Sequence, residues 1–121
     1  MTIEETKKVA IDALEDLKAL DIMAIDVLGR SSFTDMMIIA TGTSNRHVKS
    51  LADNVQRMAR ENGLDVIGVE GGEEAEWVLV DLADVIVHVM LKTVRDFYNL
   101  EKLWSDGPVM PLSQVTAAPN K

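Results

Sequence analysis

The fold is decided by residues 77–104, which read WVLVDLADVIVHVMLKTVRDFYNLEKLW. Two predicted strands, 77–82 and 85–91, are separated only by Ala83 and Asp84, so this part of the chain is expected to form a β-hairpin. A two-residue hairpin turn requires positive φ, which alanine adopts poorly. We therefore expect the turn to be one or two residues longer.

A helix is predicted over residues 93–104. Its apolar side comprises Val94, Phe97, Leu100 and Trp104. The quoted stretch also holds both tryptophans, the only tyrosine and one of the two phenylalanines. Phe97 and Tyr98 are adjacent on this helix, about 100° apart, so both cannot point straight inward. Asp81 shares a strand face with Trp77, so that face is not wholly buried. Core packing and a docking surface both account for these aromatic residues.

Toward the N-terminus, two further helices are predicted. The first covers residues 2–20, and Thr2 begins it with a capping box. The second has Thr43 or Ser44 as its N-cap and ends at Asn62-Gly63, where glycine suits the left-handed residue that follows a helix.

The remaining predicted strands cover residues 22–28, 36–40 and 66–69. The continuous apolar run at 36–40 suits a strand that is buried on both faces of a sheet. The resulting order, α-β-β-α-β-β-β-α, indicates the α/β (α+β) class, with a mixed β-sheet flanked by helices. We predict one domain over residues 1–106 and a disordered tail over 107–121.

Composition restricts the class of partner. The net charge is −8, and acidic residues are concentrated over 70–84, where there is no lysine or arginine. Nucleic-acid binding depends on basic residues that displace counterions, so an RNA chaperone and direct sequence-specific nucleic-acid binding are disfavoured. A basic protein is a better partner for an acidic surface. No apolar run is long enough to span a membrane, and the lack of cysteine fits a cytoplasmic protein.

Two segments are candidates for phosphate chemistry. Thr41–Ser44 lies at a strand–helix junction and offers backbone N–H groups to a phosphate, although any strand–helix turn needs similar residues. Asp21, Asp26 and Asp35 lie near the Gly29–Ser32 turn in the sequence. Carboxylates that converge on Mg²⁺ beside such a turn would make a nucleotidyltransferase-like phosphoryl-transfer enzyme, which is the alternative function.

The two histidines support only weak hypotheses of catalysis. Ser44 and His47 with a carboxylate would make a triad, but three common residues near a turn are weak evidence. His88 lies between two valines of a predicted strand and is expected to be a hydrogen-bonded sheet residue. Two histidines without cysteine do not indicate a zinc site.

Four strings of residues resemble the Iojap (RsfS) family of ribosomal silencing factors. They are DMMIIATGTSNR at 35–46, the Glu70-Gly71 step ahead of Trp77, DLADVIVHV at 81–89 and RDFYNLEKLW at 95–104. They occur in the family's order and spacing over about residues 3–106. The resemblance implies a mixed sheet between helices, related to the nucleotidyltransferase fold but without its catalytic residues. It therefore implies a protein that is not an enzyme and needs no cofactor.

The resemblance also implies a function. The family binds the large ribosomal subunit through ribosomal protein L-fourteen, sterically blocks association with the small subunit and represses translation when nutrients are scarce. Free members tend to be homodimers, and the factor is cytoplasmic and ribosome-associated. On this chain the implied partner-binding residues are Trp77, Leu82, Lys92, Arg95 and Tyr98. Phe97, Leu100 and the valines at 85, 87 and 89 are then expected to hold the fold. Ala83 departs from the family, which usually has glycine there.

Overall fold

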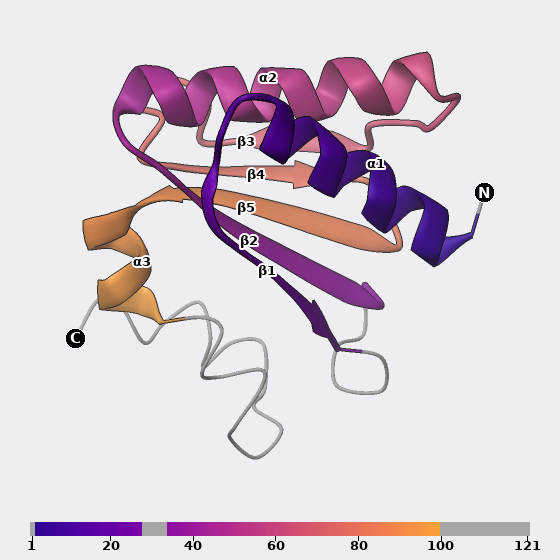
Figure 1. The fold of residues 1–121 in the computed structure, drawn as a ribbon, viewed down its shortest axis with the longest axis horizontal. Helices are drawn as coiled ribbons and strands as arrows, with labels where there is room; N and C mark the ends of the chain where they lie inside the picture. The colour runs from indigo at the N-terminus through magenta and orange to yellow at the C-terminus, as the bar shows by residue number, and fades with distance from the viewer. Residues whose placement is uncertain (1, 28–33, 100–121) are drawn as a thin grey trace.

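The structure, a computed structural model, describes residues 2–27 and 34–99. Its elements confirm the predicted order (Figure 1). They are α1 (Ile3–Asp16), β1 (Leu20–Asp26), β2 (Met36–Gly42), α2 (Asn45–Glu61), β3 (Gly68–Glu70), β4 (Trp77–Asp81), β5 (Val85–Leu91) and α3 (Lys92–Tyr98). β1 begins at residue 20 instead of the predicted 22, and β3 at 68 instead of 66. No helix in this part of the chain has the length and apolar character of a membrane span.

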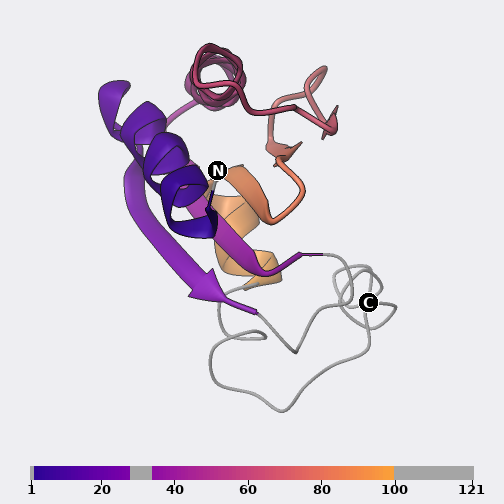
Figure 2. The same cartoon turned by 90° about the vertical axis from the view of Figure 1, so that its right-hand side faces the viewer.

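The five strands form one mixed sheet in the order β1-β2-β5-β4-β3. β2 and β5 pair in parallel, and all other neighbours in the sheet are antiparallel. α1 and α2 cover one face, whereas α3 lies on the opposite side at the end of β5 (Figures 1 and 2). Each face therefore has its own apolar core. The valines at 85, 87 and 89 belong to the core beneath α1 and α2, as expected.

β2 is buried along its whole length, as the apolar run at 36–40 predicts. Ile38 and Ala40 pack in the core beneath α1 and α2, and Met37 and Ile39 pack in the core on the side of α3. Successive side chains of a strand point to opposite faces, so a strand covered on both sides needs an uninterrupted apolar run.

Both long helices begin as predicted. Thr2 Oγ1 accepts a hydrogen bond from the Glu5 N–H at 3.1 Å, and Glu5 Oε1 accepts one from the Thr2 N–H at 2.8 Å, which confirms the capping box. Ser44 is the N-cap of α2, because its Oγ accepts from the His47 N–H at 3.1 Å. Gly63 has φ 81° just beyond the end of α2, which is the conformation expected of it.

The C-terminus of α1 comes earlier than predicted, at Asp16 rather than Leu20. Lys18 is left-handed with φ 63°, and the Ala19 N–H donates to the Leu14 carbonyl at 3.0 Å. This left-handed residue and backward hydrogen bond form a Schellman motif, which ends a helix. The motif could not be predicted from the sequence, because the left-handed position of the motif carries lysine instead of the usual glycine.

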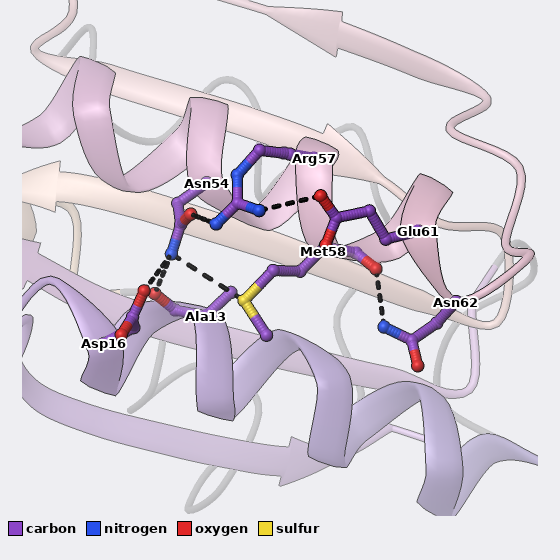
Figure 3. Close-up of polar contacts among 7 residues, drawn as sticks. All are labelled: Ala13, Asp16, Asn54, Arg57, Met58, Glu61 and Asn62. Carbon is purple, nitrogen blue, oxygen red and sulfur yellow. Dashed lines mark hydrogen bonds and ion pairs between the residues drawn. The ribbon is translucent and has the colours of Figure 1, made fainter.

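A buried asparagine joins α1 to α2 (Figure 3). Asn54 Nδ2 donates to the Ala13 carbonyl at 2.8 Å, and Arg57 Nη2 donates to Asn54 Oδ1 at 2.6 Å. Arg57 is itself held by Glu61, with 2.8 Å between Nη1 and Oε2. Carbonyl groups in the last turn of a helix have no partner inside it. The network therefore satisfies one such group of α1 and sets how the two helices pack.

The hairpin of β4 and β5 is confirmed, but the prediction of a longer turn is wrong. The Leu82 N–H donates to the Val85 carbonyl at 2.9 Å, so Ala83 and Asp84 alone form the turn. Ala83 takes φ 74°, which is unfavourable for an L-residue with a Cβ atom. Asp81 Oδ1 accepts a hydrogen bond from the Ala83 N–H at 2.8 Å and so helps to hold this conformation.

α3 is shorter than the predicted helix over 93–104. Asn99 is left-handed with φ 51°, and its N–H donates to the Arg95 carbonyl at 2.8 Å, which ends the helix at Tyr98. The rest of the predicted helix, including Leu100 and Trp104, lies outside the described residues. The tail predicted over 107–121 also lies outside them.

Candidate protein-binding surface

An aromatic cluster forms where β4 begins and α3 ends. Trp77 lies on the face of the sheet that α3 covers, and its Nε1 donates to Nδ1 of the buried His88 at 2.9 Å. Its ring meets that of Tyr98 edge-on, with ring centroids 4.6 Å apart. Tyr98 in turn meets Phe97 edge-on at 5.2 Å. These rings run from the sheet interior to solvent, and we call Trp77, Phe97 and Tyr98 the aromatic surface.

The two adjacent aromatic residues of α3 have different environments. Phe97 is 65% exposed, whereas Tyr98 is half-buried and packs with Trp77 against the core on this side of the sheet. The prediction that Phe97 holds the fold is therefore wrong. Phe97 is also a candidate binding residue that sequence reasoning missed. The sequence does indicate that one of the two rings is exposed, because adjacent residues of a helix cannot both point inward.

The two basic residues of α3 also differ in their exposure to solvent. Arg95 is 6% exposed, and its Nη1 donates to the Asp21 carbonyl at 2.6 Å and to Thr41 Oγ1 at 2.9 Å. Lys92 is exposed and forms an ion pair with Asp96 at 2.8 Å. Arg95 therefore fixes the rotation of α3 on the sheet and so sets which aromatic ring faces outward. Lys92 is the basic residue of the pair that solvent reaches.

Leu82 lies apart from the other residues that the resemblance implies. It is 4% exposed and belongs to the core beneath α1 and α2, whereas Trp77 packs on the opposite face of the sheet. Leu82 is beside the hairpin turn, and α3 follows the other end of β5 (Figure 1). Leu82 follows Trp77 by five positions of extended chain, a distance of about 17 Å. The structure thus gathers Trp77, Lys92, Arg95 and Tyr98 at one end of the sheet, without Leu82.

We expect Leu82→Ala to lower the free energy of unfolding by about 2–3 kcal/mol, because it removes buried methyl groups and leaves a cavity. Ile67→Ala is the matched control, since Ile67 is 62% exposed and its change to alanine removes the same number of carbon atoms. Its cost should stay below about 1 kcal/mol, which is the usual range for exposed positions. Urea unfolding of both variants measures the difference. Equal losses would contradict a core role for Leu82.

A groove of about 410 Å³ opens beside the aromatic surface. One wall is formed by Trp77, Val94 and Tyr98, and the other by the loop that follows β3. The loop residues that line it are Gly71, Gly72, Glu73, Glu74 and Glu76. The three glutamates are exposed, and in the described part of the chain their carboxylates take part in no ion pair or hydrogen bond. Within residues 2–27 and 34–99, the groove therefore combines aromatic rings with negative charge that no cation neutralises.

The loop is held close to Trp77 by its backbone. Gly71 has φ 85°, and a Cβ atom at this position would lie only 2.1 Å from the Trp77 carbonyl oxygen. Asn45, at the start of α2, donates from Nδ2 to the Glu74 carbonyl at 2.8 Å. The acidic wall is thus fixed to both the strand and the helix beside it.

His88 joins the aromatic surface to the interior of the sheet, which confirms that it is a hydrogen-bonded sheet residue. Burial lowers the pKa of His88 from 6.5 to about 4. The ring is therefore neutral at physiological pH, and its Nδ1 accepts the Trp77 indole hydrogen bond. An imidazole protonated on both nitrogens has no acceptor. Protonation would therefore break this support for Trp77.

Lowering the pH from 7.5 to 5 is expected to reduce the free energy of unfolding by about 2 kcal/mol through His88. Above pH 6.5 His88 is neutral in both states; below it the unfolded chain takes up a proton, while the folded chain resists until about pH 4. The stabilisation is thus complete above pH 6.5 and lost as the pH falls toward 4. His88→Asn, which keeps an acceptor but does not titrate, should show a pH dependence smaller by about this amount. If urea unfolding gave the same pH dependence for wild type and His88→Asn, the proposed contribution of His88 to stability would be wrong.

The serine–histidine hypothesis gains no support from the geometry. Ser44 Oγ caps α2, and the His47 ring is engaged elsewhere. Its Nδ1 accepts from the Thr43 N–H at 2.9 Å, and its Nε2 lies 2.7 Å from the Leu17 carbonyl, to which it donates. The Thr43 N–H is therefore also occupied, which removes one of the donors that the phosphate hypothesis required. These residues connect the end of α1 to the start of α2.

The carboxylates proposed for metal-assisted catalysis do not form a site. Within residues 2–27 and 34–99, no group of three or more histidine, aspartate or glutamate side chains could hold a metal ion. Asp21 and Asp26 lie at different positions along β1, and Asp35 precedes β2. The serines of the Gly29–Ser32 turn lie outside the described residues. The nucleotidyltransferase-like alternative is therefore unsupported.

Known proteins with similar sequences include several named ribosomal silencing factors. The profile of a family described as "Ribosomal silencing factor during starvation" matches residues 1–121. The ribosomal silencing factor RsfS of Chromobacterium violaceum is 54% identical over 118 residues, covering 98% of this chain and 95% of that protein. Its namesake in Bacillus subtilis is 47% identical over 105 residues, covering 87% and 89%. The mouse protein named "Mitochondrial assembly of ribosomal large subunit protein 1" is 31% identical over 98 residues, covering 78% of this chain and 43% of its own length.

Solved structures of similar proteins have the same fold as this chain. A crystal structure of a Chromobacterium violaceum protein superimposes with a TM-score of 0.86 and 52% identity, covering 89% of this chain and 90% of that one. A crystal structure from Bacillus halodurans gives a TM-score of 0.76 and 40% identity, covering 84% and 94%. Sequence and fold thus point to the same set of relatives.

Proposed function

The chain belongs to the family of ribosomal silencing factors, and from this premise we propose that it binds the large ribosomal subunit through ribosomal protein L-fourteen. Bound there, it sterically blocks association with the small subunit. Repression of translation, notably in starvation and stationary phase, follows from this block. The mechanism is not enzymatic: it requires affinity and the bulk of a 13.3 kDa protein, and no cofactor or proton transfer.

One observation carries the proposal: the aromatic surface at one end of the sheet is open to a partner. Phe97 is 65% exposed, and the partly exposed Trp77 and Tyr98 support it from the core. Aromatic residues concentrate binding energy at protein interfaces, especially when they are held rigidly. Lys92 and the acidic groove on either side supply a polar rim. The mouse relative's name concerns the large ribosomal subunit, which favours this subunit as the target.

Sedimentation with purified subunits tests the proposal. The chain should pellet with isolated large subunits and not with small subunits, and it should bind purified L-fourteen. In a light-scattering assay of subunit joining, it should lower the extent of association until large subunits are saturated. Failure to pellet with large subunits, or normal joining at saturation, would refute the proposed function.

We also propose that the free chain is a homodimer in the cytoplasm, as the family resemblance implies. β1 is an edge strand that exposes Leu20 and Met23, so the sheet has an open apolar edge that a second copy can cover. Sedimentation velocity over a range of protein concentrations should show a dimer. A monomer at all concentrations would exclude it.

A further inference from the structure

We propose that the groove beside the aromatic surface binds an arginine side chain of the partner protein. This inference rests on the proposed function and adds the chemistry that the partner must present. The groove is the part of the aromatic surface that the acidic loop also lines, and its volume of about 410 Å³ is in the range of specific ligand sites. It is therefore large enough for one long side chain of a partner.

The aromatic wall favours a guanidinium group. Trp77 and Tyr98 line the groove together with Val94, so the wall offers ring surface and an aliphatic floor. A planar guanidinium stacks on aromatic rings and is weakly hydrated, whereas an ammonium is a compact and strongly hydrated charge. The methylene stem of arginine can cover the valine while its charged end reaches the opposite wall.

The acidic wall supplies the counter-charge. Glu73, Glu74 and Glu76 line the groove, and within the described chain none of their carboxylates has a cationic partner. No lysine or arginine occurs in the sequence between Arg60 and Lys92, so this segment has no cation of its own for them. A guanidinium has several N–H donors in a fixed fork and forms paired hydrogen bonds with carboxylates.

A metal ion is not the occupant that the arrangement of these acids favours. In the part of the chain that the structure describes, they do not converge into a group that could hold a metal. An extended planar cation does not need such convergence. The same negative charge repels the phosphates of ribosomal RNA, so the groove selects a protein surface over nucleic acid.

The groove is already formed in the free chain. Gly71 packs against the Trp77 carbonyl with no space for a Cβ atom, and Asn45 holds the Glu74 carbonyl at 2.8 Å. A site that is formed before binding loses less conformational entropy when the partner arrives. The backbone that carries the three glutamates is thus held near Trp77 without help from the partner.

A variant that removes the negative charges of the groove tests the site on the ribosome. The triple variant Glu73→Gln, Glu74→Gln and Glu76→Gln should lower affinity for isolated large subunits at least about tenfold, because close charge pairs at interfaces couple strongly. The matched control carries the same change of charge on exposed acids outside the groove: Glu15→Gln, Asp53→Asn and Asp65→Asn. It should stay within about twofold, since distant surface charges contribute little. All six side chains are exposed, so both variants should fold.

A small probe tests the site without the ribosome. In NMR titrations, N-acetyl-arginine methylamide should shift the Trp77 indole signal and the backbone signals of residues 71–76, whereas the uncharged citrulline analogue should not. The Glu-to-Gln triple variant should abolish these shifts, and the matched control should keep them. The lysine analogue should give smaller shifts at equal concentration.

The outcomes separate this inference from the proposed function. If wild type binds large subunits but the groove variant binds equally well, or the two triple variants weaken equally, the arginine site is wrong and the proposed function stands. If wild type does not bind large subunits but the arginine probe shifts the groove signals, the proposed function fails and the site is supported. Equal shifts from the arginine and citrulline analogues would overturn the site in either case.

Discussion

Tyr98→Ala is expected to lower the affinity of the chain for isolated large subunits by about 30- to 1000-fold, which corresponds to about 2–4 kcal/mol for a central interface aromatic. The ring of Tyr98 supports both neighbours of the aromatic surface, at 4.6 Å from Trp77 and 5.2 Å from Phe97. Its loss should therefore disturb the whole surface. Co-sedimentation at several protein concentrations measures the change.

The controls separate binding from folding. Tyr98→Phe keeps the ring and should stay within about tenfold of wild type. Ile67→Ala removes a side chain that is 62% exposed beside Asp81, at the end of β4 away from the aromatic surface, and it should bind as wild type does. Circular dichroism and urea unfolding establish that each variant is folded. If Tyr98→Ala pellets as well as wild type, the aromatic surface is not the docking surface.

Trp77 is less suitable than Tyr98 as a single test, although both are implied binding residues. Trp77→Ala removes the donor to His88 Nδ1 and leaves a buried acceptor unsatisfied, which destabilises the fold as well as the surface. Phe97→Ala should leave the stability of the fold nearly unchanged, because a side chain that is 65% exposed contributes little to the core. A loss of affinity in this variant at unchanged stability would assign Phe97 to the interface directly.

Gly71→Ala is expected to lower the free energy of unfolding by about 3 kcal/mol or more, from the strain of positive φ and the overpacking of a new methyl group. The added Cβ would lie 2.1 Å from the Trp77 carbonyl oxygen, and backbone cannot move aside as a flexible side chain can. The acidic loop must then shift away from β4, so affinity for large subunits should fall as well. Urea unfolding and co-sedimentation measure the two effects.

The neighbouring glycine provides the matched control. A Cβ atom at Gly72 would have no neighbour within 4 Å, and Gly72 does not have positive φ. Gly72→Ala should therefore change stability by no more than about 0.5 kcal/mol. If Gly71→Ala and Gly72→Ala lost the same free energy of unfolding, this would contradict the close packing of Gly71 against the Trp77 carbonyl.

Most of the architecture could be predicted because it depends on local patterns. The apolar run at 36–40 needs cover on both faces, and the structure provides it. Capping residues at Thr2 and Ser44 marked the helix starts, because their side chains bond to backbone groups only a few residues away. The errors fall where a residue adopts a conformation that its type disfavours: Lys18 and Ala83 both have positive φ, and both positions usually carry glycine.

The candidate surface was only partly predictable. Trp77 and Tyr98 lie together, as the concentration of aromatic residues in this stretch indicated. Leu82 does not join them, because a β-strand sends residues an odd number apart to opposite faces. The groove combines a loop and a helix, and its geometry depends on the close contact of Gly71 with Trp77. No spacing in the sequence encodes that contact.

The sequence by itself determined the order of the elements, the strand at the interior of the sheet, the family and the acidic charge that favours a basic protein partner. Each of these follows from composition, periodicity or short motifs. Only the tertiary structure decided that Phe97 faces solvent and that Arg95 is buried. The physical reason is that the rotation of α3 depends on hydrogen bonds from Arg95 to Asp21 and Thr41, which are 74 and 54 residues away in the chain. Interactions over such separations form only when the sheet has brought those residues together.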